Sequence, residues 1–194
     1  MLHAYLGLKS FCICVSLSAS VVGSYTMKGI VALKVKLMAL QTSGQVRVDV
    51  DLATAFAFVG DPVRLAQCIP GCRDLSELSP GRYSAVLTNE VAFLTLSFKV
   101  IVEVVKVEPP STIEAKITGE AIGLVGRVAA SAGLQLSEAA PNQTDIRYTA
   151  NVGLTGKLGG LGEPVLRAKS AAVAREFGVN LKAAIEKTPT KARV

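Results

Sequence analysis

The sequence predicts an α+β domain in which a curved antiparallel sheet of about seven strands wraps on one long C-terminal helix. Residues 83–154 alternate apolar and polar side chains in runs separated by turn residues, as half-buried antiparallel strands do. Residues 163–186 repeat apolar side chains at every third or fourth position, which is the spacing of an amphipathic helix. Two short helices are predicted after the first strand.

The N-terminal region is predicted to be separate from this domain. We divide the chain into residues 1–37, one folded domain over residues 38–187 and a basic tail over residues 188–194. Three interpretations of residues 1–37 stay open: a true translation start at Met38, a signal peptide or membrane anchor, or an additional strand. The uncharged segment 10–27 contains five serines and would make a poor spanning helix. We therefore prefer the first interpretation.

Composition argues against several classes of function. The chain contains one histidine, His3, and no tryptophan, so histidine-based catalysis and mixed cysteine–histidine metal sites have little to rest on. The formal net charge is +6, but residues 1–37 hold four lysines and no acidic residue. The basic C-terminal helix could meet an anionic membrane or an acidic partner, but we prefer the interpretation that its charges form a solvated helix face. Nucleic acid is not an expected partner, because no aromatic residues interleave with these charges.

The first strand and the two short helices are predicted from alternation and capping residues. Valines alternate with polar residues from Val46 to Val50. Asp51 is the expected N-cap of a helix over the segment LATAFAFV. Asp61 is the expected cap of the second helix, where Pro62 takes the first position because its missing N–H costs nothing there.

The later strands are predicted from alternation alone. The strongest run places six apolar side chains on one face: Leu94, Leu96, Phe98, Val100, Val102 and Val104. Tandem prolines in residues 108–112 predict a turn, because they cannot continue a ladder. Shorter alternating runs cover residues 83–88, 113–118, 124–136 and 145–154.

The last predicted element is a long helix that starts at Glu163. Glu163 and Pro164 occupy its first turn, where a carboxylate and a proline are both favourable. Its apolar positions are Val165, Leu166, Val173, Ala174, Phe177, Leu181 and Ile185. A curved sheet buries its inner face only if another element fills the concavity, so this helix is expected to lie there. The predicted arrangement is a helix grip.

Three segments of the chain resemble a known family. FVGDPVRLAQCIPGCRDLSEL, GRYSAVL and TDIRYTANVGLTGKLGGLG are similar to the carbon monoxide dehydrogenase CoxG family of the START-like (SRPBCC) superfamily. The resemblance runs from about Gly44 to about Glu186. It implies a START-like ligand-binding domain of helix-grip fold, with a hydrophobic cavity between sheet and helix. It also implies an accessory role beside a molybdenum-containing CO dehydrogenase or related hydroxylase, in the cytoplasm or peripherally on the inner face of the cytoplasmic membrane.

The motif loop Cys68-Ile69-Pro70-Gly71-Cys72 raises the question of a chemical site. Two thiolates without a nearby histidine make only half of a zinc site. A redox pair usually has two rather than three residues between its cysteines. We order the alternatives as a structural turn, then a reversible disulfide, then a metal site. Pro70 and Gly71 would form a rigid reversal, with the cysteines packed as small hydrophobic side chains.

No catalytic, cofactor-binding or metal-binding residues are predicted. The glycine-rich residues 156–162 do not match a phosphate loop, since their Gly-Lys pair lacks a following serine or threonine and Glu163 would stand where phosphate must lie. Glu103, Glu114 and Glu120 are spaced as outward strand positions, and no nucleophile–base combination is visible. The protein is therefore not expected to be an enzyme.

The inward strand positions hold many small residues: Ala85, Ala115, Gly119, Gly126, Ala130, Ala132 and Ala150. Either the alanine-rich helix packs very close to them, or space remains for a guest molecule. The resemblance favours a cavity, which would select an apolar ligand by shape and burial. The residues expected to line it are Leu96, Phe98, Val100, Ala115, Ile117, Val128, Ala130, Tyr148, Val173, Phe177 and Leu181.

Two hypotheses of function follow. In the first, the protein carries or presents a lipid-like molecule or an isoprenoid quinone for a membrane-associated molybdenum oxidoreductase, because an electron-producing enzyme needs a membrane acceptor. In the second, it recruits that enzyme to the membrane through basic helix and loop surfaces, while its own core is filled.

Overall fold

The computed structural model of the chain describes residues 38–91, 94–156 and 162–187. A seven-stranded antiparallel sheet has the strand order β1-β7-β6-β5-β4-β3-β2. Its strands are β1 (Met38–Val48), β2 (Cys72–Ser79), β3 (Arg82–Val91), β4 (Leu94–Glu108), β5 (Thr112–Ala121), β6 (Gly126–Ala140) and β7 (Gln143–Gly156). The helices are α1 (Leu52–Val59), α2 (Pro62–Cys68) and α3 (Glu163–Lys187).

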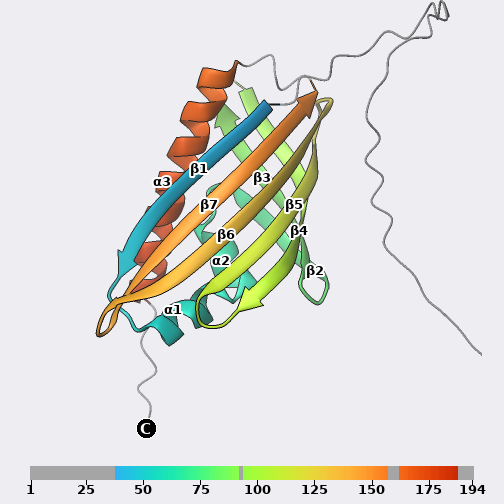
Figure 1. Cartoon of the computed structure of the whole chain (residues 1–194). Helices are drawn as coiled ribbons and strands as arrows, with labels where there is room; N and C mark the ends of the chain where they lie inside the picture. Colours follow the sequence, from blue (N-terminus) through green and yellow to red (C-terminus); the bar gives the residue numbers. More distant parts are fainter. Residues whose placement is uncertain (1–37, 92–93, 157–161, 188–194) are drawn as a thin grey trace, which may run out of the picture. The chain divides into compact units, whose positions relative to one another are not determined.

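The sheet curves strongly, α3 lies alongside β1, and α1 and α2 lie together at one end (Figure 1). We call that end basal; the opposite, apical end holds the β5–β6 turn and the start of α3. The predicted curved sheet, two short helices and long C-terminal helix are confirmed. The interpretations of residues 1–37 and of the tail over residues 188–194 lie outside the described residues.

Both short helices begin at the predicted caps. Asp51 Oδ1 accepts a hydrogen bond of 2.8 Å from the backbone N–H of Thr54, and Thr54 Oγ1 donates to Asp51 Oδ2 at 2.7 Å. These bonds hold the pKa of Asp51 below its ordinary value. Asp61 Oδ1 accepts from the backbone N–H groups of Val63 and Arg64 at 2.9 and 3.2 Å. Local capping thus fixes the residues at which α1 and α2 begin.

Three local features of the structure differ from the apolar–polar pattern of the sequence or cannot be seen in it. A register shift in β4 leaves Val105 unpaired and exposed. Leu124, expected on the apolar face of a strand, lies in the β5–β6 turn and is exposed. Val165, expected on the apolar face of the long helix, is also exposed, because only its neighbour Leu166 reaches the interior from the first turn of α3.

β2 forms one edge of the sheet and is its least regular strand. Its pairing with β3 shifts register between Arg73 and Ser76, and again between Glu77 and Ser79. Asp74 lies within the first shift in the left-handed region, at a φ of 53°. The segment RDLSELS does not alternate strictly, so alternation does not predict this strand.

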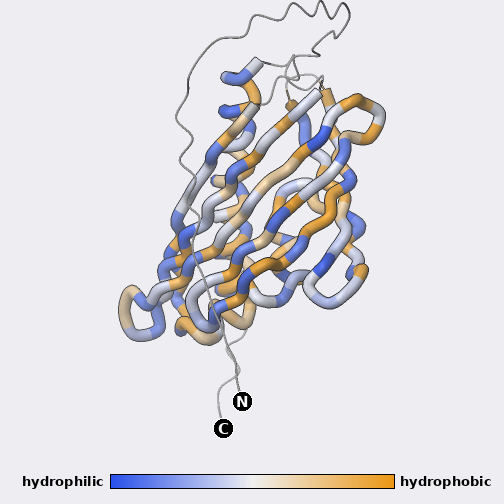
Figure 2. Tube along the Cα trace, turned by 45° about the vertical axis from the view of Figure 1, so that its right-hand side comes forward, coloured by the Kyte–Doolittle hydropathy of each residue, from blue (hydrophilic) through white to orange (hydrophobic). Residues whose placement is uncertain are grey.

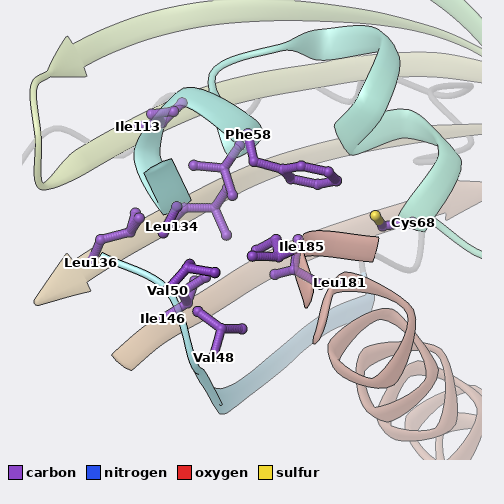
Figure 3. Packing of buried hydrophobic residues seen from close by; sticks show 12 residues of the cluster. Val48, Val50, Phe58, Cys68, Ile113, Leu134, Leu136, Ile146, Leu181 and Ile185 are labelled. Carbon is purple, nitrogen blue, oxygen red and sulfur yellow. The ribbon is translucent and has the colours of Figure 1, made fainter. Parts of the chain in front are cut away.

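The interior contains two separate hydrophobic clusters. The basal cluster joins α1, α2 and the end of α3 to the sheet, and its buried residues are Val48, Val50, Ala55, Phe58, Val59, Cys68, Ile113, Leu134, Leu136, Ile146, Leu181 and Ile185 (Figure 3). The apical cluster consists of Leu40, Val91, Leu96, Leu154 and Leu166. The basal cluster includes Leu181 and Ile185 of α3 and the apical cluster includes Leu166, so the helix is held at both ends.

α3 approaches β1 closely at a seam formed by Gly44, Tyr148 and Gly178. The Tyr148 hydroxyl lies between Gly44 of β1 and Gly178 of α3, and a Cβ atom on either glycine would overlap it. The Tyr148 ring meets the Phe177 ring edge to face, with centroids 5.2 Å apart. Burial raises the pKa of Tyr148 above its ordinary value. The seam therefore sets the distance between helix and sheet.

We predict that Gly178→Ala lowers the free energy of unfolding by about 1–2 kcal/mol, although alanine has the higher helix propensity. The added methyl group collides with the Tyr148 hydroxyl. In a Tyr148→Phe background the same substitution should cost clearly less, because the hydroxyl is absent. Urea unfolding of the four proteins in this double-mutant cycle measures the coupling. An equal loss of unfolding free energy in both backgrounds would contradict a close contact between the Tyr148 hydroxyl and Gly178.

Candidate ligand-binding site

The register of the sheet arranges inward side chains in rows that cross five strands. One row consists of Thr42, Ala150, Ala132, Ala115 and Val104. The neighbouring row on the apical side consists of Leu40, Val152, Ala130, Ile117 and Val102. The row on the basal side contains the larger Tyr148, Leu134 and Ile113. Small side chains are therefore concentrated halfway along the inner face.

We define the belt as Thr42, Ala115, Ile117, Ala130, Ala132 and Ala150. Belt residues belong to neither hydrophobic cluster. Each is half-buried, although its side chain points into the fold. Alanine side chains are too short to bridge the interior, so the two clusters do not meet at the belt. Because protein interiors are normally close-packed, half-buried side chains on the inner face make the belt the candidate for a ligand-binding surface.

The structure brings the predicted lining residues to one face of the sheet and to α3. Ala115, Ile117 and Ala130 lie in the belt; Leu96, Phe98 and Val128 lie in or against the apical cluster; Tyr148, Phe177 and Leu181 lie in or against the basal cluster. Val173 is half-buried on α3. Val100 and Leu181 are only 1% and 0% exposed, so neighbouring side chains already cover these two.

Three belt residues are absent from the predicted lining. Ala132 and Ala150 occupy inward positions of predicted strands, and their small size is the signal that marks them. Thr42 belongs to the part of β1 that precedes Gly44, where no strand is predicted. The alternation of residues 40–46 continues the pattern of the later valines and could have extended the strand.

The side chains of the belt are almost entirely apolar. Five of its six side chains are aliphatic, none is titratable, and the Thr42 hydroxyl is its one polar side-chain group. Glu103, Glu114 and Glu120 are exposed on the opposite face of the sheet, as predicted. Within residues 38–91, 94–156 and 162–187, no group of three His, Cys, Asp or Glu side chains could hold a metal ion. Such a surface can hold an apolar molecule by burial and shape.

Two open hollows lie on the outer face of the sheet. One, of about 250 Å³, is lined mainly by outward polar side chains of β5, β6 and β7 around Gly133, and the belt residues Ala115 and Ala132 also border it. The other, of about 400 Å³, lies nearer the apical end and is bordered by Lys99, Glu120 and Arg127. Both are more polar in their side chains than the belt.

The two thiols of the motif loop are free and sheltered. Cys68 is buried at the end of α2, where its Sγ lies 3.5 Å from the carbonyl oxygen of Arg64, and Cys72 is half-buried at the start of β2. Burial raises the pKa of both thiols. A protonated, sheltered thiol is a weak nucleophile and a weak metal ligand, which fits packing better than chemistry.

The turn of the motif loop joins three elements. Gly71 has a φ of 73°, and a Cβ atom there would overlap the carbonyl oxygen of Thr88 in β3. The Thr88 N–H donates to the Gly71 carbonyl at 2.9 Å. Asn180 of α3 donates from Nδ2 to the Cys68 carbonyl at 3.3 Å. The loop therefore ties α2 to both the sheet and the long helix.

We predict that Gly71→Ala destabilises the protein by at least about 2 kcal/mol more than Gly81→Ala. Both glycines have φ near 75°, at 73° and 75°, so both substitutions strain the backbone. Only Gly71 faces a fixed backbone oxygen, whereas nothing lies within 4 Å of a Cβ at Gly81. Thermal or urea unfolding of the two variants measures the difference. Equal losses would show that the contact with β3 is unimportant.

A curved antiparallel sheet around a long C-terminal helix, with two short helices after the first strand, defines a helix-grip protein of the START-like class. Solved structures share this fold. A conserved protein from Geobacillus kaustophilus has 23% identity and a TM-score of 0.68, covering 76% of this chain and 95% of that chain. The Zhui aromatase/cyclase from Streptomyces sp. R1128 has 15% identity and a TM-score of 0.52, covering 81% and 100%. At these identities the likeness concerns the fold alone.

The family model of CoxG, a subunit of carbon monoxide dehydrogenase, matches residues 44–186. The chain therefore belongs to the CoxG family, which confirms the resemblance seen in its segments. A comparison with curated proteins finds no match. In the described part of the chain, no helix is both long and apolar enough to cross a bilayer.

Proposed function

We propose that the domain binds an apolar small molecule on the belt and carries or presents it for a membrane-associated oxidoreductase. The observation that supports this proposal is the set of small, half-buried side chains between two separate hydrophobic clusters. A guest on the belt would bury aliphatic surface that the protein's own side chains leave exposed. Such burial contributes about 25 cal/mol per Å² of apolar surface.

The proposed ligand is lipid-like or an isoprenoid quinone, and the quinone is the sharper choice. Tyr148 and Phe177 lie at the basal side of the belt, where an aromatic pair could contact a flat ring. The Thr42 hydroxyl could donate a hydrogen bond to a quinone carbonyl. An isoprenoid chain would then cover the alanines. An enzyme that releases electrons also needs an acceptor in the membrane.

The proposed partner is a molybdenum-containing CO dehydrogenase or a related hydroxylase. The family is described as a subunit of carbon monoxide dehydrogenase, which supports an accessory role. The structural neighbour from Streptomyces is an aromatase/cyclase, but the belt of this chain offers no titratable side chain for acid–base chemistry. We therefore propose a non-catalytic protein without a cofactor of its own, working in the cytoplasm or on the inner face of the cytoplasmic membrane.

The alternative is a recruitment adaptor whose interior holds no ligand. The position of both hollows on the outer face of the sheet favours it. The basic residues of α3 could contribute to attachment, although ion pairs of Arg167 with Glu163 and of Lys182 with Glu186 offset part of their charge. Attachment through charge would weaken as salt is added, whereas ligand binding by burial would not.

Native mass spectrometry of protein purified without detergent tests the proposal. We expect a bound apolar molecule, or uptake of an added short-chain quinone or phospholipid. The reason is that the belt gains free energy only when a guest covers it. An empty protein that also ignores both additions would contradict the ligand carrier and favour the adaptor.

A matched pair of substitutions on β6 sharpens this test. Ala130→Leu fills the belt, whereas Ala129→Leu adds the same side chain on the exposed outer face. If the belt holds space, Ala130→Leu should change the free energy of unfolding by less than about 1 kcal/mol and reduce bound ligand. The Ala129→Leu control should alter neither. A loss of about 1–3 kcal/mol at Ala130 would indicate a filled interior.

A further inference from the structure

The turn between β5 and β6 exposes three large aliphatic side chains, which we call the apex. Ile122, Leu124 and Val125 are 55%, 41% and 71% exposed. Figure 2 shows a largely hydrophobic loop projecting at the upper right of the domain, where this turn lies. Hairpin turns usually carry glycine, asparagine or aspartate. Turn geometry therefore explains none of the three side chains, and grouped exposed apolar residues mark an interaction site.

Backbone contacts hold the base of the apex while leaving its tip free. The Ile122 N–H donates to the Ser97 carbonyl at 2.7 Å. At the end of β7, Gly156 packs so closely that a Cβ atom there would overlap the Val125 carbonyl oxygen. At the tip, a Cβ atom on Gly123 would meet nothing within 4 Å. The apex is thus presented by the sheet and not folded back onto it.

Among the described residues, the charged side chains nearest to the apex in the strand register lie just below it on the outer face. Glu120 and Arg127 form an ion pair of 3.2 Å across the base of the hairpin. Lys99 is the cross-strand neighbour of Glu120 and makes no ion pair with the described residues. These three side chains border the hollow of about 400 Å³ and carry one net positive charge. At about 3.3 Å per residue, the cations lie about 7–10 Å from the tip.

We propose that the apex inserts into the surface of a membrane containing anionic lipids, with Lys99 and Arg127 at the depth of the phosphate groups. Amphipathic elements that lie in membrane interfaces bury their apolar side to about 5–10 Å, and anionic headgroups attract basic residues beside it. The separation between the apolar tip and the cations matches this depth. Leu94 and Val165 add exposed apolar surface at the same end of the domain.

A bilayer fits the apex better than a protein partner does. A projecting tip needs a shaped socket on a protein, whereas lipids close around it. The apex also lacks the tryptophan, tyrosine and arginine side chains that dominate protein interfaces. The inference deepens the proposed function and rests on it for its purpose, since a carrier of an apolar ligand has to reach the membrane.

Sedimentation of the full chain with vesicles tests the inference. The vesicles contain phosphatidylcholine with about one third phosphatidylglycerol as the anionic lipid. The variant Ile122→Ser/Leu124→Ser/Val125→Ser should partition about 100-fold more weakly than the wild type. The control Val105→Ser/Val107→Ser changes side chains that are 45% and 52% exposed at the basal end and should bind like the wild type. Equal partition of the wild type and the apex variant would overturn the inference, provided that circular dichroism shows both folded.

A position-specific reporter separates the apex from every other part of the chain. The chain contains no tryptophan, so Val125→Trp and Val107→Trp each introduce a single fluorophore. On vesicles, emission from Val125→Trp should shift to the blue and be quenched by lipids brominated in their acyl chains, while Val107→Trp should show neither effect. Absence of quenching at position 125 in vesicle-bound protein would overturn the inference.

The same samples distinguish failure of this inference from failure of the proposed function. Native mass spectrometry reports ligand content, and tryptophan quenching reports insertion. If the protein carries no ligand but its Val125→Trp reporter is quenched, the ligand-carrier function is contradicted and insertion of the apex is supported. If the protein carries a ligand but the reporter is not quenched, the ligand-carrier function is supported and insertion of the apex is contradicted. If the apex variant no longer bound an oxidoreductase but still bound vesicles like the wild type, the apex would belong to a protein interface and the inference would be overturned.

Discussion

The close packing of α3 on β1 at Gly44, Tyr148 and Gly178 is the constraint on which the rest of the inner face depends. Without a Cβ atom on either glycine, the helix backbone can approach the edge strand, and the tyrosine fills the seam. The helix consequently contacts β1 far more than any other strand. The basal cluster then closes one end of the concavity, and the centre of the sheet is left to small side chains.

Much of the fold could be predicted because its signals act over a few residues. Asp51 and Asp61 accept hydrogen bonds from the next turn, so the starts of α1 and α2 follow from the local sequence. β2 and the bulge at Val105 could not be predicted in this way, because the register of pairing with the neighbouring strand decides them, and the residues of the strand alone do not specify that register. The exposure of Leu124 likewise depends on where β5 ends, which alternation does not specify.

The sequence predicts which face of the sheet carries the candidate site, but not which residues of that face belong to it. Alternation identifies inward positions such as Ala115 and Ala130, since a strand has a period of two. It does not reveal which of them stay uncovered, because that depends on where the helix docks and which side chains meet around it. Val100 and Leu181 are covered for that reason. If the belt binds a ligand as proposed, its small side chains are a departure from close packing of the kind found at functional sites.

The irregular edge strand has a consequence for how the protein assembles with others. A free sheet edge offers a row of unpaired N–H and C=O groups on which a further strand can add. β2 interrupts that row with two register shifts and a left-handed aspartate, and it carries exposed charges at Arg73 and Glu77. The opposite edge, β1, has α3 beside it (Figure 1). Growth of the sheet from one molecule into the next is thus discouraged on both sides, and association is directed to helices and turns.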